Sequence, residues 1–246
     1  MVTNASQKFF VIGQFEELGY ELPAENLLLE PAGKNTLPAI CYGMRAITEK
    51  FGRSVVGIFS SDHILDTKAM ETIASAEGLA SEYLITFGIF PTSPNTGYGY
   101  IKPGESLGVG YKVSEFKEKP YVEVAEKYIK EGCLWNSGMF LFDTEVFFNE
   151  LKSHAPEVSD TFESSDDIQE IYGKVPSISI DYGVMEMSDK VATVKIDDHW
   201  NDLGNFNSIY NEFDKDENGN VVYNCDDMLV NSSGNLIHSR PKKIVS

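Results

Sequence analysis

The spacing of hydrophobic residues changes from helical to strand-like several times within the first 90 positions. Helical spacing predicts helices at 7–18, at 39–51 with Pro38 in the first turn, and at 68–81. Short apolar runs predict buried strands at 27–30, 55–59 and 83–90. Because strands separated by helices of this length are typical of parallel sheets, this part predicts a parallel, doubly wound α/β sheet.

The rest of the chain predicts a mixed arrangement. Strands are expected at 111–116, 138–142 and 191–196, and helices at 122–130, 145–153 and 205–213. The acidic, serine-rich stretch 156–175 predicts a helix with a solvated face rather than a binding site. Beyond Asp214, a turn at 216–219 and short strands around Val221 and Leu229 predict a change to β structure. We therefore expect an α/β domain over 1–213 and the beginning of a small β module over 214–246.

Charge limits the possible partners. The 246 residues include 38 acidic and 20 basic ones, a net charge of -18, and no basic run is present. Such a chain repels polyanions, which excludes nucleic acid as an expected partner. A small anionic substrate can still be held by a few cations and a bound metal.

Cysteines and apolar runs indicate the compartment. The three cysteines, Cys41, Cys133 and Cys225, lie far apart without a C-x-x-C pair, which indicates neither a disulfide framework nor a zinc cluster. The apolar runs are too short to span a membrane, and the N-terminus does not resemble a signal peptide. We therefore expect a cytoplasmic protein with no membrane partner.

Two aspartates follow predicted strands. Asp62 comes directly after the strand at 55–59, and Asp202 lies in a glycine-bounded loop after the strand at 191–196. Ligands of open α/β sheets bind at the carboxyl ends of strands, and Mg²⁺ takes a few carboxylate oxygens together with water and phosphate. Either aspartate also suits a helix N-cap or a solvated loop end, so both interpretations stay open.

Two motifs suit a sugar phosphate. In Thr96-Gly97-Tyr98-Gly99-Tyr100-Ile101 the glycines allow close backbone approach, and Tyr98 offers an aromatic face and a hydroxyl. In Phe116-Lys117-Glu118-Lys119-Pro120, Glu118 is an acceptor for sugar hydroxyls and Lys119 a cation for phosphate. Taken singly, the first motif also suits a plain hairpin turn and the second an ordinary strand end.

Two further segments carry amide side chains. Asn136 and Ser137, in Leu134-Trp135-Asn136-Ser137-Gly138-Met139-Phe140, precede an apolar strand and add directional donors and acceptors. The loop Glu30-Pro31-Ala32-Gly33-Lys34-Asn35-Thr36 ends at a predicted helix start, and its backbone and amide groups suit the edge of a nucleotide base. It equally suits a simple capping loop, because Thr36 before Pro38 caps a helix well.

In this order, the motifs resemble those of the mannose-1-phosphate guanylyltransferases, sugar nucleotidyltransferases that make GDP-mannose and pyrophosphate from GTP and mannose 1-phosphate. The resemblance also covers Ser61-Asp62-His63, the stretch 179–186 and Trp200-Asn201-Asp202-Leu203-Gly204. It implies a Rossmann-like mixed α/β sheet with flanking helices, of the glycosyltransferase A type. It further implies Mg²⁺ as cofactor, with Asp62 and Asp202 as its ligands.

The resemblance assigns the other residues to three groups. Those near guanine are Glu30, Asn35, Thr36 and Pro38. Those around mannose are Tyr98, Gly99, Glu118, Asn136 and Ser137. Lys119 lies near the phosphates and completes a catalytic set with Asp62 and Asp202.

The chain departs from the family at both ends. Family members begin with a glycine-rich loop close to G-G-x-G-T-R that grips the triphosphate, whereas this chain opens at Met1-Val2-Thr3-Asn4 and stops at Ser246, where the β module begins. We therefore expect a chain truncated at both ends, with doubtful activity alone, which could form a homo-oligomer or need a partner that supplies the N-terminal segment. Two alternatives remain: a nucleotidyltransferase for another sugar 1-phosphate or nucleotide, and a non-catalytic regulatory subunit that binds nucleotide sugar.

Overall fold

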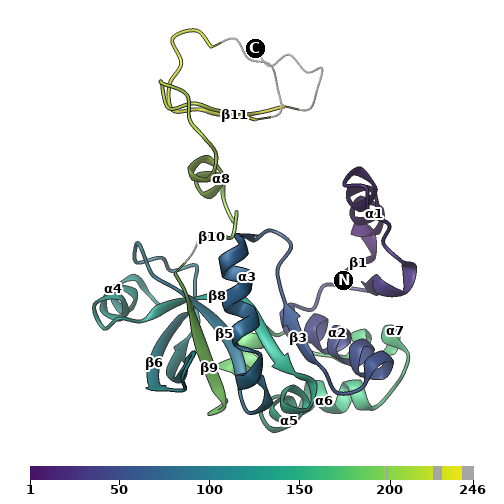
Figure 1. The fold of residues 1–246 in the computed structure, drawn as a ribbon. Coiled ribbons are helices and arrows are strands. Elements are labelled where there is room, and N and C mark those ends of the chain that lie inside the picture. The colour runs from purple at the N-terminus through teal and green to yellow at the C-terminus, as the bar shows by residue number, and fades with distance from the viewer. Residues whose placement is uncertain (198, 224–228, 240–246) are drawn as a thin grey trace.

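The computed structural model describes residues 1–197, 199–223 and 229–239 (Figure 1). The strands are β1 Val2–Asn4, β2 Leu28–Glu30, β3 Val55–Ile58, β4 Ile64–Leu65, β5 Leu84–Ile89, β6 Tyr100–Ser106, β7 Tyr111–Lys117, β8 Leu134–Asp143, β9 Val191–Ile196, β10 Trp200–Asn201, β11 Val221–Tyr223 and β12 Leu236–His238. The α-helices are α1 Lys8–Glu17, α2 Thr36–Phe51, α3 Thr67–Ser75, α4 Val122–Lys130, α5 Thr144–His154, α6 Pro156–Glu163, α7 Ile168–Lys174 and α8 Phe206–Glu212. Short helical turns lie at Ala5–Gln7, Ala24–Asn26 and Glu77–Ser81, and a π-helical turn lies at Asp181–Met185.

The central sheet is mixed. Its six strands lie in the order β3-β8-β5-β9-β7-β6, and β6 also pairs with β8. β3 and β5 run in the same direction, but β8 lies between them and is antiparallel to both. Among the described strand pairs of this sheet, only β5 and β9 are parallel. The predicted mixed α/β fold with flanking helices is confirmed, whereas the parallel pairing predicted for successive early strands is wrong because β8 is inserted between them.

The strand β8 lies between β3 and β5, and almost all of its residues are buried. Successive side chains point to opposite faces of the sheet. Phe140 and Phe142 pack in a cluster with α2, α5, α6 and α7, whereas Met139 and Leu141 pack in a second cluster with α3. Strands covered by helices on both faces carry continuous apolar runs, which explains the composition of β8.

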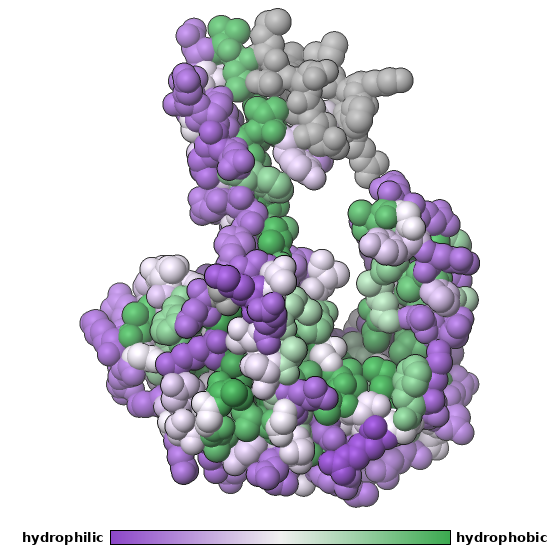
Figure 2. Space-filling view, viewed as in Figure 1, coloured by the Kyte–Doolittle hydropathy of each residue, from purple (hydrophilic) through white to green (hydrophobic). Residues whose placement is uncertain are grey.

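The N-terminal segment lies beside this body rather than within it. β1 and β2 form a separate parallel pair, and Leu28 to Glu30 are half-buried rather than buried as predicted. The helix α1 was predicted correctly, but it buries none of its residues, and Phe9 and Phe10 are 80% and 68% exposed. Figure 2 shows open space between this segment and the part of the chain around α8, which rises from the same side of the body.

The C-terminal strands are described only in part. β11 lies at Val221 as expected and pairs in parallel with β12. A strand was also expected around Leu229, but residues 224–228 lie outside the described residues. Cys225 falls outside the described residues. The division of the chain at residue 213 stays a prediction.

Other element boundaries differ modestly. The helix predicted at 68–81 is α3 followed by the turn Glu77–Ser81, and the stretch 156–175 forms two helices, α6 and α7. The strand predicted at 138–142 begins four residues earlier, at Leu134, so that Asn136 and Ser137 lie inside it. The strand β6 and the π-helical turn were not predicted.

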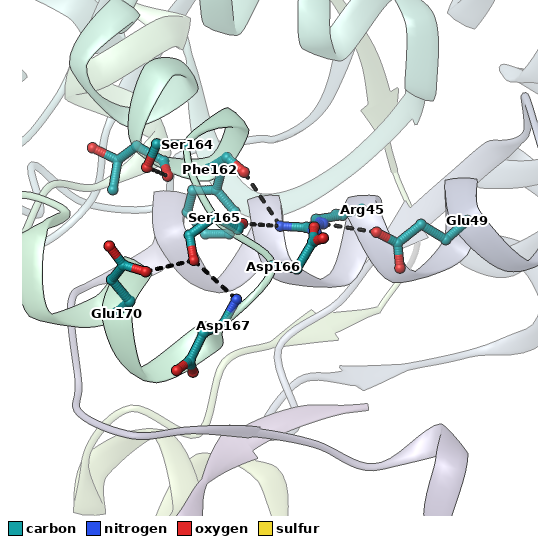
Figure 3. Close-up of polar contacts among 9 residues, drawn as sticks. Arg45, Glu49, Phe162, Ser164, Ser165, Asp166, Asp167 and Glu170 are labelled. Atoms are coloured by element: carbon teal, nitrogen blue, oxygen red, sulfur yellow. Dashed lines mark hydrogen bonds and ion pairs between the residues drawn. The ribbon is translucent and has the colours of Figure 1, made fainter.

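Arg45 joins α2 to the end of α6 and the loop that precedes α7 (Figure 3). Its Nη1 donates to the carbonyl oxygens of Phe162 (3.2 Å) and Ser165 (2.9 Å), and its Nε pairs with Glu49 at 2.7 Å. Its Nη2 also pairs with Asp166. Arg45, Glu49, Phe162 and Asp166 border a small cavity of about 170 Å³ between the helices. One guanidinium group thus ties the acidic stretch to α2.

No helix in the described parts of the chain is long and apolar enough to cross a membrane. Cys41 and Cys133 are buried free thiols.

Candidate functional site

The two predicted metal ligands lie in loops next to two strands that pair with each other. β4 and β10 are antiparallel, with Asn201 opposite Ile64 and Trp200 opposite Leu65. Asp202 follows β10 directly, and Asp62 lies two residues before Ile64, so the pairing brings the loops that carry both carboxylates to one place. The side chain of Asp62 is 61% exposed, and Asp202 is half-buried.

The carboxylate of Asp202 is held by two donors. Tyr98 Oη donates to its Oδ2 at 2.7 Å, and the backbone N–H of Gly204 donates to its Oδ1 at 3.0 Å. Between Asp202 and Gly204, Leu203 has a φ of 45°, in the left-handed region that non-glycine residues seldom adopt. The loop therefore fixes the direction of this carboxylate before any ligand binds.

Aromatic rings lie beside the aspartates. His63 and Trp200 meet edge to face with ring centroids 5.5 Å apart, and Tyr98 contacts Trp135 at 4.9 Å and Trp200 at 5.9 Å. Burial lowers the pKa of His63, an effect that Asp62 and Asp202 oppose, so the ring is neutral near pH 7. A neutral, buried imidazole suits a packing role beside Trp200.

Gly99 lies where side chains crowd the backbone. Its carbonyl oxygen accepts the N–H of Asn136 at 2.8 Å. A Cβ at this position would lie 2.5 Å from Glu118 Oε2 and 3.2 Å from the Cβ of Asn136. Only glycine fits without displacing these side chains, and this brings three of the predicted sugar-binding residues together.

Glu118 and Lys119 form an ion pair at the end of β7. Glu118 is buried, and its Oε1 lies 2.9 Å from Nζ of the more exposed Lys119. The hydrogen bond that Lys119 donates to Glu118 raises the pKa of Lys119, which is therefore a full cation at neutral pH. Lys119 has a φ of 46°, and the N–H of Glu118 donates to Glu186 Oε1 at 2.6 Å. Backbone in this region costs free energy, and such residues cluster at ligand sites.

Asn136 is buried in β8 and bonded on both sides. Its Oδ1 accepts from Thr86 Oγ1 at 2.7 Å, and its Nδ2 donates to Asp181 Oδ1 at 2.8 Å. Ser137 is also buried, and its Oγ accepts the N–H of Met139 at 3.2 Å. This hydrogen bond gives Ser137 a structural role within the strand, and its contact with the sugar stays a prediction.

The predicted nucleotide-binding residues lie around the start of α2. Asn35 has a φ of 69°, and its Oδ1 accepts the N–H of Thr36 at 2.8 Å. Thr36 Oγ1 in turn accepts the N–H of Ile180 at 2.9 Å. Pro38 is buried in the first turn of α2, and its place near the base stays a prediction. The loop does cap α2, but the cap is Asn35 rather than Thr36 as predicted. Asn35 and Thr36 are exposed.

Glu30 lies at the end of β2 and contacts α7. Tyr172 Oη donates to Glu30 Oε1 at 2.9 Å. Burial raises the pKa of Glu30, and the hydrogen bond from Tyr172 partly offsets this rise. A carboxylate held in this way retains acceptor capacity for the N–H groups of a base edge.

The structure therefore brings the predicted residues into linked groups. Tyr98 joins Asp202 to the sugar motifs, Gly99 joins Glu118 to Asn136, and Thr36 contacts the residue before Asp181. Sequence reasoning missed four partners of these residues, which are Thr86, Tyr172, Asp181 and Glu186. Asp181 and Glu186 lie in the stretch 179–186, which the resemblance had singled out without giving its members a role.

Two carboxylates with room for other ligands suit Mg²⁺, which commonly completes its coordination with water and phosphate. Within the described residues no group of three or more His, Cys, Asp or Glu side chains is placed to hold a metal ion. Asp62 and Asp202 thus fit a metal shared with substrate phosphates better than a closed protein cage. Their role as ligands stays a prediction.

Comparisons with known proteins identify the family of the chain. A family model described as nucleotidyl transferase matches residues 1–219. A putative mannose-1-phosphate guanylyltransferase of Vibrio cholerae is 35% identical over 262 residues, which cover all of this chain and 55% of the relative. The mannose-1-phosphate guanylyltransferase of Klebsiella pneumoniae is 33% identical, over 96% of this chain and 55% of its own length. The chain thus spans about half the length of the curated relatives it matches.

Two solved structures are also similar. One, described as a mannose-1-phosphate geranyltransferase from Thermus thermophilus, has a TM-score of 0.78 and 32% identity, over 90% of this chain and 66% of that chain. The other, described as a mannose-6-phosphate isomerase from Helicobacter pylori, has a TM-score of 0.68 and 30% identity, over 81% of this chain and 82% of that one. With a family model matched over most of its length and relatives at this level of identity, the chain belongs to the nucleotidyl transferase family.

Proposed function

We propose that this chain is part of a mannose-1-phosphate guanylyltransferase, which forms GDP-mannose and pyrophosphate from GTP and mannose 1-phosphate. The hydrogen bond between Tyr98 and Asp202 carries the proposal, because it connects the sugar motifs with the candidate metal carboxylate. The names of the Vibrio and Klebsiella relatives support the choice of substrates. A cytoplasmic location belongs to the proposal, and the buried free thiols suit a reducing compartment.

The chemistry explains why these residue types suffice. An oxygen of the sugar phosphate attacks the α-phosphorus of GTP in line, a bond forms between them, and pyrophosphate leaves with the electron pair of the broken bond. The attacking phosphate is largely ionised at neutral pH, because the second pKa of a phosphate monoester is about 6. A general base is therefore not required. Catalysis depends instead on alignment and on neutralising charge.

The residues of the chain are suited to those two tasks. Lys119 is the cation for the sugar phosphate, and its ion pair with Glu118 keeps it beside the candidate sugar site. Asp62 and Asp202 would hold Mg²⁺, which when bound neutralises phosphate charge. Gly99, Glu118, Asn136 and Tyr98 would contact the sugar. Glu30, Asn35 and Thr36 would read the guanine edge, with Pro38 as part of the scaffold.

The first experiment is pyrophosphate release by the chain with Mg²⁺, GTP and mannose 1-phosphate, run beside UTP, dTTP and glucose 1-phosphate. Direct binding of GDP-mannose is measured on the same samples by calorimetry. Release with GTP and mannose 1-phosphate in preference to the other pairs supports the proposal. Preference for another pair favours a nucleotidyltransferase of different specificity.

Two other outcomes would also be informative. Binding of GDP-mannose without release would favour the non-catalytic regulatory subunit. Interconversion of mannose 6-phosphate and fructose 6-phosphate would instead favour the activity named for the Helicobacter pylori protein.

A further inference from the structure

The carboxamide of Asn136 is held in one orientation by three segments. Its Oδ1 accepts from Thr86 Oγ1 at 2.7 Å and from the backbone N–H of Gly138 at 3.3 Å. Its Nδ2 donates to Asp181 Oδ1 at 2.8 Å. Because the Gly138 N–H can only donate and an ionised carboxylate can only accept, the two ends of the amide cannot exchange without losing bonds at both.

The partners come from distant parts of the chain. Thr86 lies in β5 and is completely buried, Asn136 lies in β8, and Asp181 begins the π-helical turn. The neighbouring side chains on these strands form apolar clusters on both faces of the sheet. Apolar residues could fill this volume without the cost of burying polar groups. The hydrogen bonds of Thr86 and Asp181 to Asn136 therefore indicate that the orientation of the amide matters, and not only the filling of space.

Ionisation of Asp181 costs free energy in the folded protein. Burial, followed by repulsion from Glu118, raises its pKa to about 6, although its bond from Asn136 and the nearby Lys119 act in the other direction. Carboxylates in such surroundings concentrate at functional sites. Glu118 and Lys119 are also the residues assigned to the sugar phosphate, so Asp181 borders the same place from the opposite segment.

We propose that Asp181 and Thr86 are positioning residues that fix the Asn136 carboxamide, so that its second Nδ2 hydrogen is presented in a single direction to a hydroxyl of the bound hexose 1-phosphate. This inference rests on the proposed function, since it assigns the amide to the sugar. One Nδ2 hydrogen is used by Asp181, which leaves the other for the ligand. A reversed amide would present the acceptor Oδ1 at this place, so the hydrogen bond to the sugar hydroxyl would need the hydroxyl as donor.

The test uses the full chain with the variants Asp181→Ala, Thr86→Val and Asp189→Ala. Asp189 is an exposed carboxylate from the same segment and serves as the matched control. Two properties are measured: the side-chain amide resonances of Asn136 by NMR, and the dissociation constants for mannose 1-phosphate, GDP-mannose and GTP. Asp181→Asn and Thr86→Ser are added because each retains a hydrogen-bonding group at its position.

Asp181→Ala and Thr86→Val should each move the Asn136 amide resonances and weaken mannose 1-phosphate binding about tenfold, equivalent to about 1.4 kcal/mol. GTP binding should not change. Asp189→Ala should behave as the wild type, and Asp181→Asn and Thr86→Ser should recover most of the affinity. Among monodeoxy analogues of mannose 1-phosphate, the wild type should discriminate against one, and both disruptive variants should lose that discrimination.

The outcomes separate this inference from the proposed function. A wild type that binds mannose 1-phosphate, with unchanged affinity and unchanged Asn136 resonances in both disruptive variants, would overturn the inference alone. A folded wild type that binds neither mannose 1-phosphate nor GDP-mannose would overturn the proposed function and, with it, the role assigned to the amide. If Thr86→Val does not fold, Asp181→Ala and Thr86→Ser decide the question.

Discussion

The hydroxyl of Thr36 accepts the backbone N–H of Ile180 at 2.9 Å, across 144 positions of sequence. Thr36 begins α2 in the candidate nucleotide loop, and Ile180 immediately precedes Asp181 in the segment that holds Asn136. Leu37 N–H donates to the carbonyl of Ile178 at 3.2 Å, so the same two segments are joined twice. These two hydrogen bonds therefore join the candidate base site to the candidate sugar site.

Replacing Thr36 by valine should test that connection. Ile180 is completely buried, so its N–H would be left without an acceptor. An unsatisfied buried donor costs about 1–3 kcal/mol, and the free energy of unfolding should fall by that amount in urea denaturation. Thr36→Ser keeps the oxygen and should retain most of the stability. A larger loss in Thr36→Ser than in Thr36→Val would show that the methyl group, not the hydroxyl, matters here.

Gly99→Ala should damage the candidate sugar site. The new Cβ would lie 2.5 Å from Glu118 Oε2, and Glu118 is held by Lys119 and through its backbone by Glu186. We expect mannose 1-phosphate to bind at least about tenfold more weakly in calorimetry, equivalent to about 1.4 kcal/mol.

Gly97→Ala is the matched control for that substitution. A Cβ there would meet only the end of the Asn95 side chain, at 3.1 Å, and that side chain can move. Unchanged affinity is expected. Equal weakening by the two substitutions would show that loop flexibility, rather than contact with Glu118, determines binding.

Local patterns predicted the elements well. The strand 191–196 and the helix 122–130 have the bounds expected from sequence. Both are short segments whose apolar spacing matches one regular structure, and their neighbours do not override it. The residues of the sugar motifs also meet as expected, because Gly99 and Asn136 are joined through their backbones beside the pairing of β6 with β8.

Pairing between distant segments could not be predicted in the same way. The position of β8 between β3 and β5 depends on which strand is apolar on both faces, and hydrophobic spacing does not specify neighbours. The exposure of Phe9 and Phe10 is a further example, because helical spacing alone does not show what a helix packs against. Asp181 was missed for the same reason: its partner Asn136 lies 45 positions away.

Asp202→Asn should remove metal dependence while preserving the fold. The side chain keeps its shape, but it loses the charge that a hard divalent cation prefers. We expect Mn²⁺ affinity in the presence of GDP-mannose to fall, and any Mg²⁺-dependent pyrophosphate release to fall by about two to three orders of magnitude, since each tenfold corresponds to about 1.4 kcal/mol of barrier.

Tyr98→Phe provides the comparison for Asp202. It removes only the 2.7 Å hydrogen bond that orients the carboxylate and keeps the aromatic contacts. Its effect should be smaller, about 10-fold, as for other groups that orient a metal ligand. Normal Mn²⁺ binding by Asp202→Asn would remove Asp202 from the candidate ligands.

Arg45→Met should destabilise the protein without affecting ligand binding. It leaves the carbonyl oxygens of Phe162 and Ser165 without their donor and separates α2 from the loop before α7 (Figure 3). We expect the free energy of unfolding to fall by about 1–3 kcal/mol. Lys152→Met removes an exposed ion pair of 3.6 Å with Glu163 and should cost less than about 1 kcal/mol. A smaller loss for Arg45→Met than for Lys152→Met would contradict the role assigned to the guanidinium group.

Asp181→Asn should increase stability at neutral pH, and the increase should depend on pH. Burial raises the pKa of Asp181 from 3.8 to about 6, so between these values the folded state binds more protons than the unfolded state. Stability from this group is therefore greatest below the unfolded pKa and falls as pH rises through the folded pKa. Asparagine removes the cost of the buried charge but can still accept the Asn136 N–H.

The expected difference follows from the size of the shift. At about pH 8 the variant should exceed the wild type by about 1–3 kcal/mol in the free energy of unfolding, since one pKa unit corresponds to about 1.4 kcal/mol. Below the unfolded pKa of 3.8 the two proteins should be nearly equal. Asp189→Asn, at an exposed position of the same segment, is the matched control. Suppose that Asp181→Asn raised the free energy of unfolding by the same amount at both pH values. The cause would then be packing rather than the charge of Asp181, and burial beside Glu118 would not destabilise the ionised carboxylate.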